Sequence, residues 1–331
     1  MLTIIFLIFI IICGVFIYYF FIAKPSVQKN ITWGVTFSQM QAEALKLDWK
    51  KTYLAILKDL GVKNIKLHTQ WDWIESEKGN YYFDDVDWQV SQAEQSGAKL
   101  IYVVGMKTGR WPECHLPDWA ETLSKEEQQA ELLKYVKEVV LRYKGQKSVI
   151  AWQVENEPLF NFGVCPWYDK DFLVKEISLV KSLDPARPII ISDSGEQSFW
   201  FEAARIGDIV GTTMYRKVWV HITDKYGFYF EFPMPPISYW LKSRLIEKLF
   251  GKRVINVELQ AESWVRDVSA DISLKEQEQT MDLNQFKKNI DYAKQTGFDE
   301  FYFWGTEWWF WLKETQHNPE IWNTARELFQ Q

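Results

Sequence analysis

The chain contains few residues of the types that bind metals. Among its 331 residues are three cysteines and four histidines. The histidines, His68, His115, His221 and His317, are scattered along the chain and show no paired ligand spacing. The sequence therefore predicts no metal centre.

The chain also lacks the signatures of several common ligand sites. It has no glycine-rich phosphate loop and no Gly-x-Ser-x-Gly nucleophile elbow. The net charge is −6, and no basic run occurs in the body of the chain, which argues against a nucleic-acid groove. We therefore expect no cofactor and no nucleic-acid partner.

Apolar and aromatic side chains are abundant. Hydrophobic residues make up 47% of the chain and aromatic residues 17%. This content can build one large core, and α/β barrels of this length fold as single domains. We expect one catalytic domain, residues 31–331, that is monomeric.

A long apolar segment precedes this domain. Leu2 to Ala23 is a run of 22 residues without a charge, long enough to cross a bilayer core of roughly 30 Å at about 1.5 Å per residue. We interpret residues 1–23 as a transmembrane signal-anchor and residues 24–30 as a linker. An uncleaved anchor is favoured over a cleaved signal peptide, because the end of the segment offers no convincing small-residue cleavage site.

Charge and cysteine content favour different sides of the membrane. Lys24 and Lys29 follow the apolar segment and, taken alone, favour a cytoplasmic body. Cys114 and Cys165 follow consecutive predicted strands, and a disulfide between them would imply an oxidising compartment. The alternative is two unrelated buried thiols, and the sequence leaves both readings open.

The body repeats one unit eight times: a short apolar strand, a polar or aromatic loop and an amphipathic helix. Such alternation indicates a parallel sheet, and eight units indicate closure into an α/β fold of the (β/α)8 TIM barrel type. An insertion rich in aromatic residues and proline, 218–239, follows the sixth strand. The predicted strands are 31–37, 62–71, 99–106, 149–158, 188–194, 208–215, 253–260 and 298–305. Predicted helices include 84–96, 124–145, 169–183, 241–250, 274–296 and 319–329.

Acidic residues gather where the predicted strands end, which is where such barrels carry their catalytic groups. The fourth strand ends in Glu155, Asn156 and Glu157 before Pro158. Burying polar groups at a strand end costs free energy, so such groups are expected to have a function. Two carboxylates on non-adjacent strands are what glycoside hydrolysis requires. Glu157 and Glu258, on the fourth and seventh strands, can converge across the barrel mouth. The other carboxylates at strand ends are Asp72, Glu75, Asp193, Glu196, Glu262 and Glu307.

Three segments resemble clan A of the retaining glycoside hydrolases, the superfamily of cellulase-like, β-galactosidase-like and β-mannanase-like barrels. They are WQVENEP at 152–158, VINVELQAESW at 254–264, and KNIKLHTQWDWIESEKGNYYFDDVDW at 63–88. The likeness spans residues 31–327. It implies a (β/α)8 barrel that acts on carbohydrate, and it does not single out one family.

The resemblance also implies roles for individual residues. Glu157 matches the acid/base, Glu258 the nucleophile and Asn156 the residue that contacts the sugar hydroxyl next to the reacting carbon. Tyr215 matches the tyrosine that holds the nucleophile, and Trp304 matches the aromatic platform beneath the reacting sugar.

Lys66 departs from the clan pattern, which usually has an arginine near the nucleophile. A lysine supplies charge but no bidentate fork.

Simpler roles compete with these. Glu262 or Glu307 could replace Glu258 as nucleophile, and Asn156 could only cap a turn. Tyr215 and Trp304 could be packing residues. His68 is either a substrate hydrogen-bonder or a satisfied core histidine. We add Trp71 and Trp264 to the predicted substrate-binding residues because both follow strand ends.

Ten of the 18 tryptophans follow strand ends, where indole faces suit the C–H faces of sugars. A cleft that exposes several of them would favour endo action. The ten tryptophans are Trp71, Trp73, Trp111, Trp167, Trp200, Trp219, Trp264, Trp304, Trp308 and Trp309.

The leading hypothesis is a retaining β-glycosidase of a poly- or oligosaccharide, anchored in a membrane with an extracytoplasmic catalytic domain. The alternatives are a transglycosylase of the same fold and a catalytically silent glycan-binding barrel.

Overall fold

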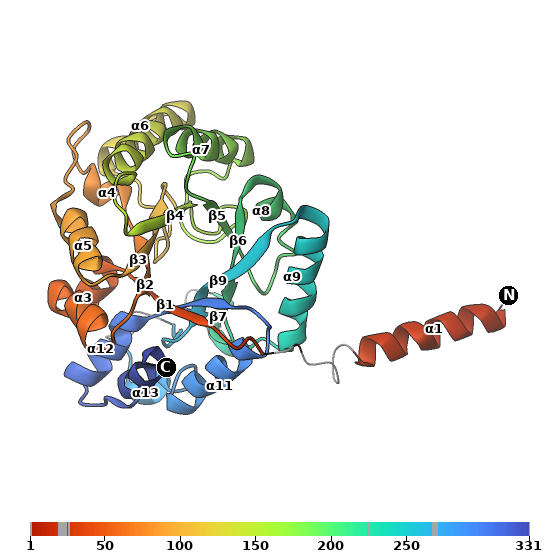
Figure 1. Cartoon of the computed structure of the whole chain (residues 1–331). Coiled ribbons are helices and arrows are strands. Elements are labelled where there is room, and N and C mark those ends of the chain that lie inside the picture. Colours follow the sequence, from red (N-terminus) through yellow and green to blue (C-terminus); the bar gives the residue numbers. More distant parts are fainter. Residues whose placement is uncertain (1, 19–24, 26, 224–225, 267–270, 331) are drawn as a thin grey trace.

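Eight parallel strands close into a barrel, as the sequence predicts (Figure 1). The computed structural model describes residues 2–18, 25, 27–223, 226–266 and 271–330. Neighbours around the ring follow the order β1-β10-β9-β6-β5-β4-β3-β2. The strands are β1 Thr32–Phe37, β2 Asn64–His68, β3 Lys99–Val104, β4 Val149–Val154, β5 Ile189–Asp193, β6 Ile209–Met214, β9 Arg253–Gln260 and β10 Glu300–Trp304.

Helices surround this ring on its outer side (Figure 1). The longest, α6, begins with the predicted capping box, in which Ser124 and Glu127 satisfy each other's backbone N–H groups. The helices of the barrel are α2 Gln39–Ala44, α3 Trp49–Lys58, α4 Trp71–Ile74, α5 Asp84–Gln95, α6 Lys125–Tyr143, α7 Lys170–Leu183, α8 Phe201–Ile206, α9 Pro236–Phe250, α10 Leu274–Gln277, α11 Leu283–Lys294, α12 Thr306–Glu314 and α13 Glu320–Phe329.

The core has two parts, because the strands are buried on both faces. One large cluster lies between the strands and the helices. A smaller cluster fills the inside of the barrel below its mouth, and its members are Ile101, Ala151, Ile190, Ile255, Val257 and Tyr302. The filled interior leaves the polar residues at the carboxyl ends of the strands to line the mouth.

Several predicted elements differ in detail. The fourth strand, predicted to reach residue 158, ends at Val154. The second strand ends at His68, because α4 begins at Trp71. The predicted helix 274–296 is two helices, since Asp282 caps a new one, α11. The insertion contains an antiparallel hairpin of β7 Lys217–His221 and β8 Gly227–Glu231.

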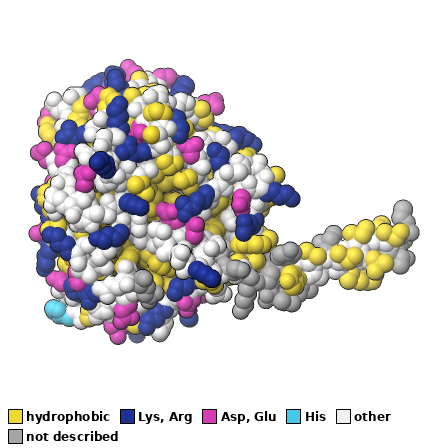
Figure 2. All heavy atoms as spheres, in the orientation of Figure 1, with side chains coloured by type: hydrophobic (Ala, Val, Ile, Leu, Met, Phe, Trp, Pro, Cys, Tyr) yellow, Lys and Arg dark blue, Asp and Glu magenta, His cyan; other side chains and the backbone are white. Residues whose placement is uncertain are grey.

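The N-terminal segment contains one helix, α1 Leu2–Ile17, which is 16 residues long. It projects from the barrel (Figure 1), and its visible side chains are mainly apolar, whereas charges of both signs cover the barrel face in the same view (Figure 2). The expected anchor also includes residues 19–23, which lie outside the described residues. Within the part of the chain that the structure describes, no helix has the length and apolarity needed to span a membrane. The expected transmembrane helix is therefore not confirmed.

Candidate active site

The end of β4 has an unusual backbone that directs several polar side chains into the mouth. Glu155 and Glu157 have φ angles of 60° and 42°, in the left-handed region that residues other than glycine seldom occupy. The backbone N–H of Glu157 donates to Ser192 Oγ at 2.8 Å. Backbone strain of this kind is typical of functional sites.

Glu258 lies on β9 and is held by two donors, one on β2 and one just after the end of β6. Its side chain is buried, and Lys66 Nζ donates to Oε1 at 2.7 Å. The Tyr215 hydroxyl donates to Oε2 at 2.8 Å. Lys66 thus supplies the positive charge, and Tyr215 supplies the second hydrogen bond. These two residues together bind both carboxylate oxygens, which a single arginine side chain could bind by itself.

Glu157 is buried in the same mouth. Burial raises the pKa of its carboxyl well above the usual range, and the negative charges of Glu258 and Glu113 raise it further. Thr213 Oγ1 donates to Glu157 Oε1 at 3.2 Å. A carboxyl group in this setting holds its proton more tightly than an exposed glutamic acid does.

Asn156 connects the two sides of the mouth. Its Oδ1 accepts hydrogen bonds from Lys66 Nζ at 3.2 Å and from Gln153 Nε2 at 3.0 Å. Lys66 therefore touches both Glu258 and the residue next to Glu157. The structure brings together the residues predicted from the fourth and seventh strands.

Two buried charged residues near Glu157 were not singled out by the sequence. Lys107 Nζ donates to the backbone carbonyls of Glu157 at 3.0 Å and Phe160 at 2.8 Å, and burial lowers its pKa. Glu113 hydrogen-bonds the Asn156 side chain, and burial raises the pKa of Glu113. Both lie on the segment after β3, so the strand-end rule could have found them if it had been extended through that loop.

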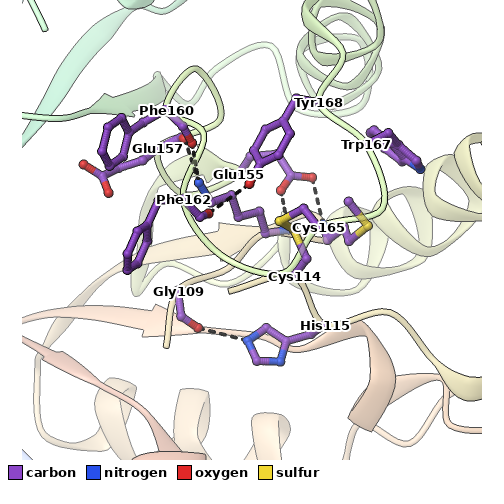
Figure 3. Close-up of a disulfide and its surroundings, with 12 residues drawn as sticks. Gly109, Cys114, His115, Glu155, Glu157, Phe160, Phe162, Cys165, Trp167 and Tyr168 are labelled. Carbon is purple, nitrogen blue, oxygen red and sulfur yellow. Dashed lines mark hydrogen bonds between the residues drawn. A yellow bond between two sulfur atoms is a disulfide. The ribbon is translucent and has the colours of Figure 1, made fainter. Parts of the chain in front are cut away.

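Glu155 has a structural role. Its carboxylate accepts backbone N–H bonds from Met106 at 2.8 Å and Lys107 at 2.5 Å, on the segment after β3 (Figure 3). It also pairs with Glu176 on α7, whose pKa is raised well above the usual range by burial and then by the Glu155 charge. Glu155 therefore joins the ends of β3 and β4.

Trp304 lies at the end of β10 and is 6% exposed. The guanidinium of Arg110 lies 4.1 Å from the centre of its ring, and the His68 ring meets it edge-on at 5.5 Å. His68 Nδ1 contacts the backbone carbonyl of Thr108. Trp304 and His68 are thus at the mouth as predicted, with Arg110 as a neighbour that the sequence left undecided.

The two rivals for the nucleophile are engaged elsewhere. Arg110 forms ion pairs with Glu262 and, at 3.3 Å, with Glu307. The backbone N–H of Ser38 also donates to Glu307 at 2.5 Å. Burial raises the pKa of Glu307 to about 7, despite the nearby Arg110 charge. These contacts make Glu258 the better candidate.

The tryptophans divide between core and rim. Trp71 exposes none of its surface and donates to Glu75 Oε2 at 2.7 Å, so it has no face free for a sugar. Trp264 is half-buried and meets the Tyr215 ring edge-on at 4.8 Å. Of the ten rim candidates, five are buried: Trp71, Trp200, Trp304, Trp308 and Trp309. The partly or fully exposed ones are Trp73, Trp111, Trp167, Trp219 and Trp264.

A disulfide joins the loops that follow β3 and β4. Cys114 and Cys165 are bonded, with Cα atoms 5.2 Å apart (Figure 3). This resolves the alternative that the sequence left open. The bond lies beside Glu155 and one residue from Glu113. It therefore restrains the two loops that surround Glu157.

Comparisons with known proteins agree with this geometry. A sequence model of the family described as "Glycosyl hydrolase family 10" matches residues 27–198, just over half of the chain. The match includes Asn156 and Glu157 and ends before Glu258.

Similar solved structures include xylanases and β-galactosidases. Xylanase 10B from Thermotoga petrophila RKU-1 shares 17% identity and a TM-score of 0.56, with 86% of each chain covered. An endo-β-1,4-xylanase from Gloeophyllum trabeum shares 14% identity and a TM-score of 0.54, with 84% of this chain and 85% of that one covered. The β-galactosidase from Rahnella sp. R3 has 12% identity and a TM-score of 0.60 over 93% of this chain, which spans only 57% of that enzyme. At these identities the likeness establishes the barrel fold.

Proposed function

Because the chain belongs to glycosyl hydrolase family 10, we propose that it hydrolyses β-linked poly- or oligosaccharides with retention of configuration. In this proposal Glu258 is the nucleophile and Glu157 the acid/base. Asn156, Tyr215, Trp304, His68 and Trp264 position the sugar or the nucleophile.

In the first step the Glu258 carboxylate attacks the anomeric carbon as the glycosidic C–O bond breaks. Glu157 transfers its proton to the departing oxygen. Lys66 and Tyr215 orient the attacking carboxylate through its two oxygens. The products are a glycosyl ester of Glu258, a released alcohol and ionised Glu157.

In the second step water replaces the ester. Once Glu258 is esterified its negative charge is gone, and with it one of the charges that raise the pKa of Glu157. Glu157 can then accept a proton from water as the water oxygen attacks the anomeric carbon. The bond to Glu258 breaks, its carboxylate is restored, and Glu157 is protonated again.

The observation that carries the proposal is the different environment of the two carboxyl groups. Glu258 receives an ammonium and a hydroxyl donor, while Glu157 is buried beside that negative charge with a raised pKa. A buried carboxyl group with a raised pKa suits a proton donor, and a carboxylate whose two oxygens both accept hydrogen bonds is oriented for attack.

The test compares Glu258→Gln and Glu157→Gln on a panel of aryl β-glycosides and on β-1,4-xylan and β-glucan. Glu258→Gln should lose at least about 10⁴-fold in kcat on every substrate. Glu157→Gln should lose much less on 2,4-dinitrophenyl glycosides, whose leaving group needs no proton, than on poor leaving groups. Glu202→Gln, on the exposed face of α8, is the control. An active Glu258→Gln variant, or product of inverted configuration in NMR, would contradict the assignment.

We also propose that the catalytic domain works outside the cytoplasm, attached through residues 2–23. The Cys114–Cys165 disulfide supports this location, because cytoplasmic thiols are kept reduced. The uncharged run of 22 residues supports the attachment. Thiol labelling in intact cells tests the location, and labelled Cys114 and Cys165 would argue against it. Carbonate extraction of membranes tests the attachment, and release of the protein by carbonate would argue against that.

A further inference from the structure

Apolar side chains form a connected, exposed patch on the outer surface of α8 and α9. On α9, Leu245 is 39% exposed and Leu249 is 59% exposed, and Phe199, just before α8, is 66% exposed. The Phe199 ring stacks on Phe201 at 6.0 Å, and the Phe201 ring lies 6.1 Å from the Phe250 ring of α9. Single apolar residues on a surface are ordinary, but a contiguous group indicates an interaction site. These five residues are called the α8–α9 patch below.

Basic side chains run along α9 beside the patch. Arg244 and Lys248 are exposed and lie four residues apart, as do Leu245 and Leu249, so the helix carries a basic row next to an apolar row. Arg244 pairs with Glu247 at 2.6 Å, whereas Lys248 forms no ion pair within the described ranges. An apolar row beside a basic row is typical of helices that lie at a membrane surface.

The N-terminal segment reaches the barrel at the start of this helix. A Cβ added to Gly297 would lie 3.2 Å from Pro25 and 2.8 Å from the Trp240 ring, so both residues pack against this glycine. Gln28 Nε2 donates to the carbonyl of Gly297 at 3.1 Å. The apolar run ends at Ala23, two positions before Pro25, and two residues span at most about 7 Å. A bilayer that holds this run would therefore lie close to the first turns of α9.

Trp240 connects this entry point to the basic row. It precedes Arg244 by four residues, and the Arg244 guanidinium lies 5.7 Å from the centre of its ring. Leu245 and Leu249 follow Trp240 by five and nine residues, about 8 and 14 Å along the helix axis. Figure 1 shows α9 at the edge of the barrel from which α1 projects. The patch thus lies on the side that an anchored chain would bring toward the bilayer.

The charges of this surface favour lipid over another copy of the chain. Arginine and lysine side chains are attracted to anionic headgroups, while leucine and phenylalanine side chains enter the boundary with the acyl chains. A second copy seated symmetrically on the same patch would bring the two basic rows together, which costs free energy.

We propose that the α8–α9 patch docks on an anionic lipid surface and holds the barrel against the membrane beside its anchor. The proposal rests on the proposed attachment through residues 2–23 and goes beyond it, because a tether alone leaves the barrel free to turn. A few partly exposed side chains bind lipid weakly by themselves, so the docking depends on the attachment.

The test uses the full chain in vesicles of phosphatidylcholine and phosphatidylglycerol, with a polarity-sensitive fluorophore on Leu245→Cys. Cys13→Ala removes the free thiol that the fluorophore would also label. The matched control is a fluorophore on Leu141→Cys, because Leu141 is 38% exposed and lies on α6, away from α1 (Figure 1). Spin-labelled lipid should quench the Leu245→Cys probe at least about threefold more than the Leu141→Cys probe.

A second comparison tests the charge. Arg244→Glu combined with Lys248→Glu should reduce the quenching of the Leu245→Cys probe to the level of the control probe, and vesicles without phosphatidylglycerol should do the same. Arg244→Lys keeps the charge and should leave the quenching unchanged. Thermal unfolding should show that every variant is folded.

Several outcomes would overturn the proposal. Equal quenching of the two probes would exclude docking. Quenching that neither charge reversal nor loss of phosphatidylglycerol alters would exclude an anionic lipid as the partner. A blue shift of the Leu245→Cys probe without quenching by lipid, growing with the ratio of protein to lipid, would show instead that a second copy covers the patch.

Flotation of the vesicles separates this proposal from the attachment. A chain that does not float would overturn both, whereas a chain that floats with equal quenching of the two probes would overturn docking alone. Neither measurement depends on hydrolysis, so the proposed glycosidase activity is tested independently.

Discussion

Lys66 is the only cation that the structure places within hydrogen-bonding distance of Glu258 among the described residues. It is fully buried, so its removal leaves a buried carboxylate without its charged partner. We expect Lys66→Met to lower kcat at least about 100-fold on aryl glycosides. The control is Lys63→Met, at a lysine just before the same strand that contacts only a backbone carbonyl on the surface. Equal kcat values in the two variants would show that Lys66 does not orient the nucleophile.

The charge of Glu113 should influence the pH range of activity. Its negative charge raises the pKa of Glu157, after burial and Glu258. In the proposed mechanism activity requires protonated Glu157, so activity should fall on the alkaline side as pH rises through that pKa. In Glu113→Gln the pKa of Glu157 should fall, and the alkaline limb of the kcat/KM profile should move to lower pH. A limb that stays in place, or moves to higher pH, would exclude this coupling.

Glu307 should make the stability of the barrel depend on pH. Its pKa is raised from 4.5 to about 7 in the folded chain by burial. The folded state therefore binds the proton more tightly than the unfolded state, and the contribution is fully present below pH 4.5 and lost as pH rises through about 7. The loss is about 3 kcal/mol at most, taking about 1.4 kcal/mol per pKa unit.

The measurement is chemical unfolding at several pH values between 4 and 8. The free energy of unfolding should fall more steeply with pH in the wild type than in Glu307→Gln, which cannot titrate. Parallel pH dependences for the two proteins would mean that this carboxyl is not protonated in the folded state.

At the scale of elements, the loops after β3 and β4 act as one unit. The backbone bonds to Glu155, the Lys107 bonds to two carbonyls and the Cys114–Cys165 disulfide all connect them (Figure 3). These loops surround Glu157, so its position depends on contacts between segments rather than on β4 alone.

Removal of the disulfide should lower stability more than it alters chemistry. The bond closes a segment of 51 residues, for which chain entropy predicts about 4 kcal/mol of stabilisation. We expect the Cys114→Ser, Cys165→Ser double variant to unfold at lower denaturant concentration by an amount of this order. Its kcat at 25 °C should fall by less than about tenfold, because Glu155 and Lys107 still connect the loops. An unchanged unfolding midpoint would show that the bond contributes nothing to stability.

At the scale of the whole molecule, the barrel and the N-terminal helix are spatially separate. α1 projects from the barrel, whereas Gln28 already contacts the barrel through the carbonyl of Gly297 (Figure 1). The residues that form the core and the mouth all lie after residue 30.

A protein that begins at Lys24 should therefore fold and keep its catalytic constants. We expect its thermal unfolding midpoint and its kcat/KM on an aryl glycoside to match those of the full chain in detergent. Membrane association should be lost. A truncated protein that unfolds at a lower temperature would show that the first 23 residues contribute to the barrel.

The sequence alone determined the barrel and the principal residues of its mouth. Alternating strands and helices, each with its own hydrophobic period, specify the eight units. The strand-end rule then narrows the candidate carboxylates to those near the mouth, Glu157 and Glu258 among them, without any coordinates. Local patterns such as the capping box at Ser124 were also readable, because they depend on residues only three positions apart.

Only the tertiary structure decided which side chains are exposed and which charged side chains pair with one another. Trp71 and Trp73 are two residues apart and similar in sequence context, yet one is fully buried and the other lines a cavity. Likewise Arg110 engages Glu262 and Glu307, and this leaves Glu258 to Lys66 and Tyr215. Three of these four pairings join residues more than 150 positions apart, and the fourth joins Tyr215 to Glu258 across 43 positions. All four depend on the closure of the ring, which no local pattern encodes.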